Sequence, residues 1–74
     1  MNLSEITVGK SVIIENLLCA GKARQRLIDL GIFVGREVLV AGFAPLGDPM
    51  IIEIAGSRVA IRKSAVREII CKLL

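Results

Sequence analysis

The chain contains no histidine, tryptophan or tyrosine, and Phe33 and Phe43 are its only aromatic residues. Without histidine it lacks the commonest general base and the commonest metal ligand of proteins. With two aromatic rings it offers few platforms on which nucleic-acid bases could stack. These absences argue against an enzyme and against a dedicated nucleic-acid binder.

Long apolar runs are also absent. The longest, VLVAGFAPL, is interrupted by Gly42 and Pro45 and is well short of the roughly 20 residues that a membrane helix needs. The first ten residues, MNLSEITVGK, show no charged segment followed by an apolar one, so we expect no secretory signal. The sequence therefore predicts a cytoplasmic protein without a membrane span.

Potential metal ligands are few and dispersed. Cys19 and Cys71 lie far apart, and in a reducing cytoplasm such a pair is more often two free thiols than a disulfide. The carboxylates are scattered as well: Glu15, Asp29, Glu37, Asp48 and Glu53. Because metal sites need clustered ligands, we expect no metal site, no cofactor and no catalytic residues.

What the chain does have is an aliphatic composition. Of its 74 residues 54% are hydrophobic, mostly Ile, Leu, Val and Ala, which favours strands and partly offsets the small core of so short a chain. The length accommodates one domain, residues 1–74. Its net charge of +3 is mild and spread along the chain.

Apolar residues at spacings of three and four predict a helix over residues 20–30. They are Ala20, Ala23, Leu27 and Leu30. Gly31 follows directly, where glycine most easily adopts the left-handed conformation that ends a helix. We expect this helix to cover one open end of a barrel, with Ala23, Leu27 and Leu30 turned toward the core.

Five β-branched stretches predict strands. They cover residues 11–17, 37–43, 50–55, 58–61 and 69–74. Gly42 is a plausible bulge, and a hairpin turn is expected at Gly56-Ser57. Ser64 is expected to cap a single helical turn over residues 65–68, before the last strand. Five short strands and one short helix indicate a closed or partly closed β-barrel.

The segment APLGDPM, residues 44–50, has two interpretations. Pro45 and Pro49 fix their own φ and push the preceding residues toward extended backbone, so the residues between them can turn sharply. The segment could be only a stiff hairpin loop that sets strand register. Alternatively, it is also a rigid, exposed recognition loop.

Three stretches at their spacings, QRLIDLGIFVG, APLGDPM and GSRVAIRKSAVREI, together resemble the FeoA family of ferrous iron transport proteins. The resemblance covers nearly the whole chain. It implies an SH3-like β-barrel and a cytoplasmic accessory role beside FeoB, the membrane transporter whose N-terminal part is a GTP-binding domain. Cys19 departs from the family pattern, since that region is commonly small or polar, so no metal or redox role is carried over to it.

For a partner such as FeoB, we expect the contact loop to consist of Leu46, Gly47, Asp48 and Pro49. A second candidate surface lies on the helix. If Leu27 and Leu30 turn inward, Ile28 projects outward near Arg24, and an exposed isoleucine beside an arginine suits an interface.

Other possibilities stay open at this point. Several basic residues could form a positive face or only a solvated surface: Arg24, Arg26, Arg36, Arg58, Arg62, Lys63 and Arg67. An SH3-like module linked to metal-dependent transcription regulation or nucleic-acid binding is the alternative function, although no helix-turn-helix is predicted. A small apolar barrel could also associate as a homodimer.

Overall fold

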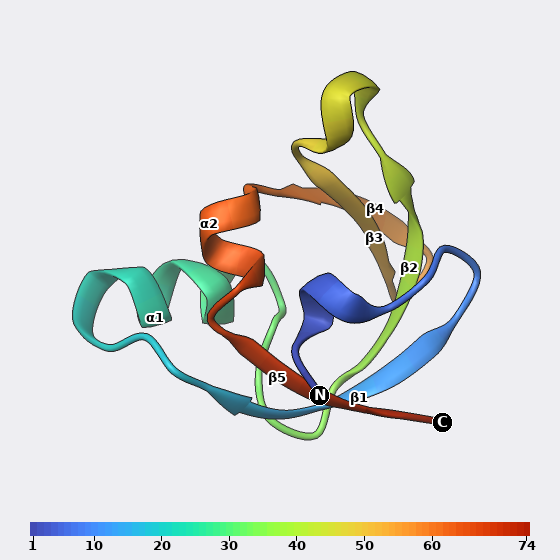
Figure 1. Ribbon diagram of the computed structural model, residues 1–74. Helices are drawn as coiled ribbons and strands as arrows, with labels where there is room; N and C mark the ends of the chain where they lie inside the picture. The colour runs from blue at the N-terminus through green and yellow to red at the C-terminus, as the bar shows by residue number, and fades with distance from the viewer.

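The structure, a computed structural model, describes all 74 residues and consists of short strands and helices (Figure 1). In chain order these are the 3-10 turn η1 (Leu3–Glu5), β1 (Ser11–Leu17), α1 (Gly21–Asp29), β2 (Glu37–Phe43), the 3-10 turn η2 (Pro45–Gly47), β3 (Met50–Ile54), β4 (Ser57–Ile61), α2 (Lys63–Val66) and β5 (Ile69–Leu73). The predicted mainly β fold, with one helix between the first two strands and a helical turn before the last, is confirmed.

The five strands form one antiparallel sheet in the order β4-β3-β2-β1-β5. The sheet curls, and α1 and α2 lie on its open side, between the two edge strands (Figure 1). Because β4 and β5 do not pair, the barrel is only partly closed. The register of β2 on β3 shifts between Val40 and Gly42, which confirms the bulge expected there.

The core is entirely apolar: all 16 buried residues are hydrophobic, and no polar or charged residue is buried. It follows from alternation along the strands, as in β3, where Met50, Ile52 and Ile54 face inward and the residues between them are half-buried. Full burial of one such side chain is worth about 1.5–3 kcal/mol. Together they supply most of the stabilisation available to so short a chain.

Helix α1 forms where predicted but is rotated about its axis. Leu27 is buried and Ile28 packs against the core, whereas Leu30 and Ala23 are exposed. The predictions that Leu30 and Ala23 face the core and that Ile28 projects outward are therefore wrong. The inward positions follow an i, i+3, i+4 pattern that starts at Arg24. Arg24 can occupy an inward position because its Nη1 donates to the Leu17 carbonyl at 3.1 Å, at the end of β1.

Helix α1 ends as expected. Gly31 has φ +96°, and its N–H donates to the Ile28 carbonyl at 2.9 Å. A Cβ at Gly31 would meet the Ile54 side chain at ordinary van der Waals distance. The restriction at this position therefore comes from the backbone conformation rather than from lack of space.

The β3–β4 hairpin turns one residue earlier than predicted. Its two central residues are Ala55 and Gly56, both with positive φ (50° and 84°), and Ile54 pairs with Ser57. Two consecutive positive φ values define a type I′ turn, whose twist matches that of the flanking strands. That match overrides the cost of placing alanine in a left-handed conformation.

Helix α2 also begins earlier than predicted, at Lys63 rather than at Ala65, and its N-cap residue is Arg62 rather than Ser64. The Ser64 side chain makes no capping hydrogen bond. The first turn is instead capped from a distant part of the chain, because Asp48 Oδ1 accepts from the Lys63 N–H at 2.9 Å.

The two cysteines are free thiols, as predicted, with Cys71 buried and Cys19 half-buried. Burial raises the pKa of the Cys71 thiol above its ordinary value. Neither helix has the length or the apolar character that crossing a membrane requires.

Candidate recognition loop

The loop of residues 44–49 projects beyond the barrel between β2 and β3 (Figure 1). Leu46 lies in this loop with its side chain fully exposed. Its backbone is left-handed, with φ 73° and ψ 7°, a conformation that costs a non-glycine residue about 1–2 kcal/mol. A strained backbone that presents an unburied leucine stabilises nothing within the domain, which makes Leu46 a candidate contact residue.

Hydrogen bonds hold the loop in this shape. The Gly47 N–H donates to the Ala44 carbonyl at 2.9 Å, and the Ala44 N–H donates to the Pro49 carbonyl at 2.9 Å. Pro45 occupies the first turn of η2, where its fixed φ suits a helical turn. Ala44 and Asp48 are both extended, as expected for residues before proline. The loop is therefore a stiff support for its tip.

Asp48 has a structural role within this loop. Its carboxylate caps α2 through the Lys63 N–H and so fastens the loop to the helix. A capping carboxylate typically contributes about 0.5–2 kcal/mol. Of the four residues predicted as the contact loop, Asp48 therefore has a clear role in the fold, whereas the Leu46 side chain is free to meet a partner.

An apolar pocket of about 40 Å³ lies at the base of the loop. Its lining residues are Ser4, Phe43, Gly47, Met50, Lys63 and Val66. Phe43 is 45% exposed. The loop thus has one exposed apolar residue at its tip, Leu46, and a second at its base, Phe43. Two apolar contact points of this kind are typical of small recognition surfaces.

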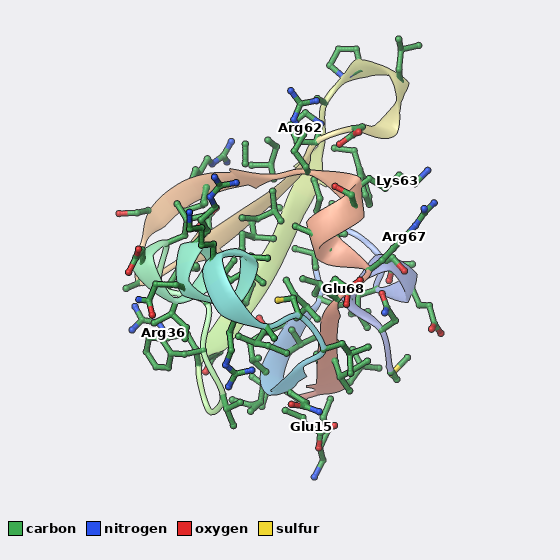
Figure 2. All side chains as sticks on the ribbon, turned by 90° about the vertical axis from the view of Figure 1, so that its left-hand side faces the viewer. Glu15, Arg36, Arg62, Lys63, Arg67 and Glu68 are labelled. Atoms are coloured by element: carbon green, nitrogen blue, oxygen red, sulfur yellow. The ribbon has the colours of Figure 1, made fainter.

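Basic residues lie beside this end of the molecule. Figure 2 shows Arg62, Lys63 and Arg67 near α2, with Lys63 and Arg67 directed to the same side. None of the three forms an ion pair, since the single salt bridge of the structure joins Arg58 to Glu53 at 3.6 Å. Asp48 in the loop and Glu68 after α2 lie among them, so this end of the molecule carries both signs of charge with a small positive excess.

Two of the other predicted basic residues do not join this group. Arg24 is bound to the Leu17 carbonyl, and Arg36 stacks over the Phe33 ring at 5.2 Å from its centroid. The basic residues that could have formed a single positive face therefore lie in separate places.

The helical pair predicted as a second contact surface lies on α1, away from the loop (Figure 1). Arg24 and Ile28 do lie on one face of the helix, but that face is turned toward the barrel. Both side chains hold α1 in place. The structure thus does not bring the two predicted surfaces together.

The sequence reasoning missed an open groove of about 440 Å³ on the outer face of the sheet. Ser11, Leu39 and Glu53 form a row across β1, β2 and β3 along its floor. Glu37 and Arg36 also line it. Only the cross-strand register brings these residues together, and no local motif signals it.

No group of three or more His, Cys, Asp or Glu side chains lies close enough together to hold a metal ion. What the structure presents most distinctly is a small, partly closed antiparallel barrel with a stiff loop and an exposed apolar tip. Rigid barrels that carry contact residues on loops are typical of recognition domains. The fold is therefore that of a small SH3-like domain.

The chain belongs to the FeoA family, whose domain matches residues 1–73. This domain is SH3-like and non-catalytic. A curated relative is the Fe(2+) transport protein A/Fe(2+) transporter FeoB fusion protein of Porphyromonas gingivalis, which is 30% identical over 74 residues. That match covers all of this chain but only 9% of the fusion protein.

Solved structures agree with the family assignment. Iron(II) transport protein A of Clostridium thermocellum superposes with a TM-score of 0.94 at 28% identity, covering 100% of this chain and 46% of that one. The zinc complex of Stenotrophomonas maltophilia FeoA, described as a prokaryotic SH3 domain protein, has a TM-score of 0.82 at 26% identity and covers 97% and 89%. The manganese regulator SloR shares the fold alone, with a TM-score of 0.87 at 11% identity.

Proposed function

We propose that this protein is a cytoplasmic, non-enzymatic accessory domain that binds a FeoB-type ferrous iron transporter and supports or regulates iron(II) uptake. The observation that carries this proposal is the Porphyromonas gingivalis relative, in which FeoA and FeoB are fused in one chain. Fusion holds two partners at a high effective concentration. Where the two are separate chains, a binding surface must supply that proximity.

The contact surface in this proposal is the recognition loop, with Leu46 as its anchor. An exposed leucine that enters a partner pocket gains about 1.5–3 kcal/mol from burial, and the stiff loop loses little entropy on binding. Phe43, at the loop base, extends the apolar contact. Gly47 and Pro49 shape the loop, and Asp48 fixes it to α2.

Iron uptake by cells tests the proposal. A strain without this gene, but with its transporter intact, is complemented with the wild-type protein, with Leu46→Ala or with Leu18→Ala. Leu18 is a matched control because it is another exposed leucine, 56% accessible, at the opposite end of β1 from the recognition loop. We expect uptake to be restored by the wild type and Leu18→Ala and to remain low with Leu46→Ala.

Protein levels are measured in the same cells, so that an unstable variant is not mistaken for an inactive one. Full uptake in the deletion strain would contradict the transport role. Full rescue by Leu46→Ala would instead retain the transport role and reject the loop as the contact surface. A nucleic-acid titration of the purified protein tests the alternative function, and salt-sensitive binding would favour it.

A further inference from the structure

Strand β4 presents an unpaired edge. It is the last strand of the sheet and pairs only with β3. The opposite edge strand, β5, is partly covered, because Asn2 bridges Ile70 and the Cys71 N–H donates to the Met1 carbonyl at 2.7 Å. No comparable segment lies along β4.

The hairpin register identifies the free groups. In a hairpin with a two-residue turn, the residues that flank the turn exchange hydrogen bonds, and so does every second pair after them. Here those pairs are Ile54 with Ser57, Ile52 with Val59, and Met50 with Ile61. The N–H and C=O groups of Arg58 and Ala60 therefore point away from β3, and neither residue takes part in any of the turn, loop or cap hydrogen bonds.

The side chains around this edge are positively charged. Arg58, Ala60 and Arg62 are all exposed and alternate with the inward Val59 and Ile61. The Arg58 side chain is 73% exposed despite its ion pair with Glu53, and Arg62 has no ion pair. Figure 2 shows Arg62 pointing outward where β4 ends and α2 begins.

The positive charge along the edge bears on which strand could pair with β4. If a second copy paired antiparallel with its own β4 about Ala60, Arg58 of one copy would lie opposite Arg62 of the other. Like charges directly opposite each other destabilise a strand pair, so this register of self-pairing is disfavoured. A strand with acidic side chains at those positions would gain both ladder hydrogen bonds and two charge pairs.

We infer that the free edge of β4 is a docking site for an extended acidic peptide segment of a partner protein. The segment adds a sixth strand to the sheet and carries the pattern acidic-x-apolar-x-acidic. Its acidic residues face Arg58 and Arg62, and its central apolar residue faces Ala60. The site borders the recognition loop at Arg62, but it uses neither Leu46 nor Phe43.

Amide hydrogen exchange followed by NMR tests the edge itself. In the free protein we expect the Arg58 and Ala60 amides to exchange rapidly, while the Val59 and Ile61 amides are protected by pairing with β3. Titration with a capped peptide containing Glu-Thr-Val-Thr-Glu should protect the Arg58 and Ala60 amides. Protection of both amides in the free protein would overturn the inference, because the edge would already be occupied.

Two variants test the recognition chemistry. Ala60→Pro removes an outward N–H without removing a β3–β4 hydrogen bond, and Arg62→Glu reverses one charge. Each should weaken peptide binding at least about tenfold, a loss of 1.4 kcal/mol. Lys72→Glu, on the opposite edge strand, is the matched charge control and should leave binding unchanged.

The competing occupants give different results. A Lys-Thr-Val-Thr-Lys peptide that binds as tightly as the acidic one would overturn the acidic assignment. A dimer in sedimentation that disappears in Ala60→Pro would show that a second copy occupies the edge, and would also overturn it. None of these results depends on iron uptake, so this inference and the proposed function fail separately.

Discussion

Replacing Leu46 with glycine should leave the domain as stable as the wild type or make it more stable. The left-handed backbone of Leu46 costs about 1–2 kcal/mol, and glycine avoids this cost. Glycine in turn loses about 0.5–1 kcal/mol through the greater freedom of the unfolded chain. Because the leucine side chain is fully exposed, no burial is lost. The net change in the free energy of unfolding is a gain of between zero and about 1.5 kcal/mol.

The assay is urea or thermal unfolding followed by far-ultraviolet circular dichroism, since the chain has no tryptophan or tyrosine to report by fluorescence. In a domain of this size, a gain of 1 kcal/mol raises Tm by about 4–8 °C. Leu46→Ala keeps the Cβ and the strain, so its stability should stay within about 0.5 kcal/mol of the wild type. A loss of 1 kcal/mol or more in either variant would show that the Leu46 side chain is packed within the domain, and would refute the reasoning.

Three further predictions concern the fold. Asp48→Ala should lower the free energy of unfolding by about 0.5–2 kcal/mol, and Asp48→Asn by less, because it keeps a capping oxygen. Ala55→Asn should raise it by up to about 1 kcal/mol, since asparagine tolerates the left-handed turn position. Both changes can be measured by urea unfolding. For Cys71, the raised pKa means that the unfolded state loses a proton at lower pH than the folded state. Stability should therefore fall as pH rises above about 8.5, and Cys71→Val should remove that part of the slope.

The strands were largely predictable from the sequence because local chemistry determines them. β1 and β2 have the predicted bounds, since each is a run rich in Val, Ile and Leu that begins directly after a glycine and a basic residue. Gly31 ends α1 for a reason visible in the sequence, as glycine readily adopts the left-handed conformation found there.

The rotation of α1 was not predictable from periodicity alone. Apolar residues at 27, 28 and 30 allow two overlapping inward faces, and spacing does not decide between them. The contact of Arg24 with the Leu17 carbonyl favours the face that includes Ile28. That contact depends on where β1 ends in space.

In the candidate sites, too, features that depend on neighbouring residues could be predicted, whereas features that depend on distant residues could not. The two prolines and the glycine of the loop predict a stiff, exposed turn, and the structure has one. The capping of α2 by Asp48 joins residues 15 positions apart. Likewise, the free edge of β4 exists only because of the strand order. Neither feature has a local signature in the sequence.

The most direct test of the central claim is a calorimetric titration of the purified protein against its FeoB transporter, with wild type, Leu46→Gly and the control Leu18→Ala. Loss of a leucine anchor worth about 1.5–3 kcal/mol should weaken binding roughly 10- to 100-fold. We predict this loss for Leu46→Gly at undiminished stability, and wild-type affinity for Leu18→Ala. Equal affinity of all three proteins would contradict the assignment of the loop as the contact surface, and no binding by the wild type would contradict the proposed partner.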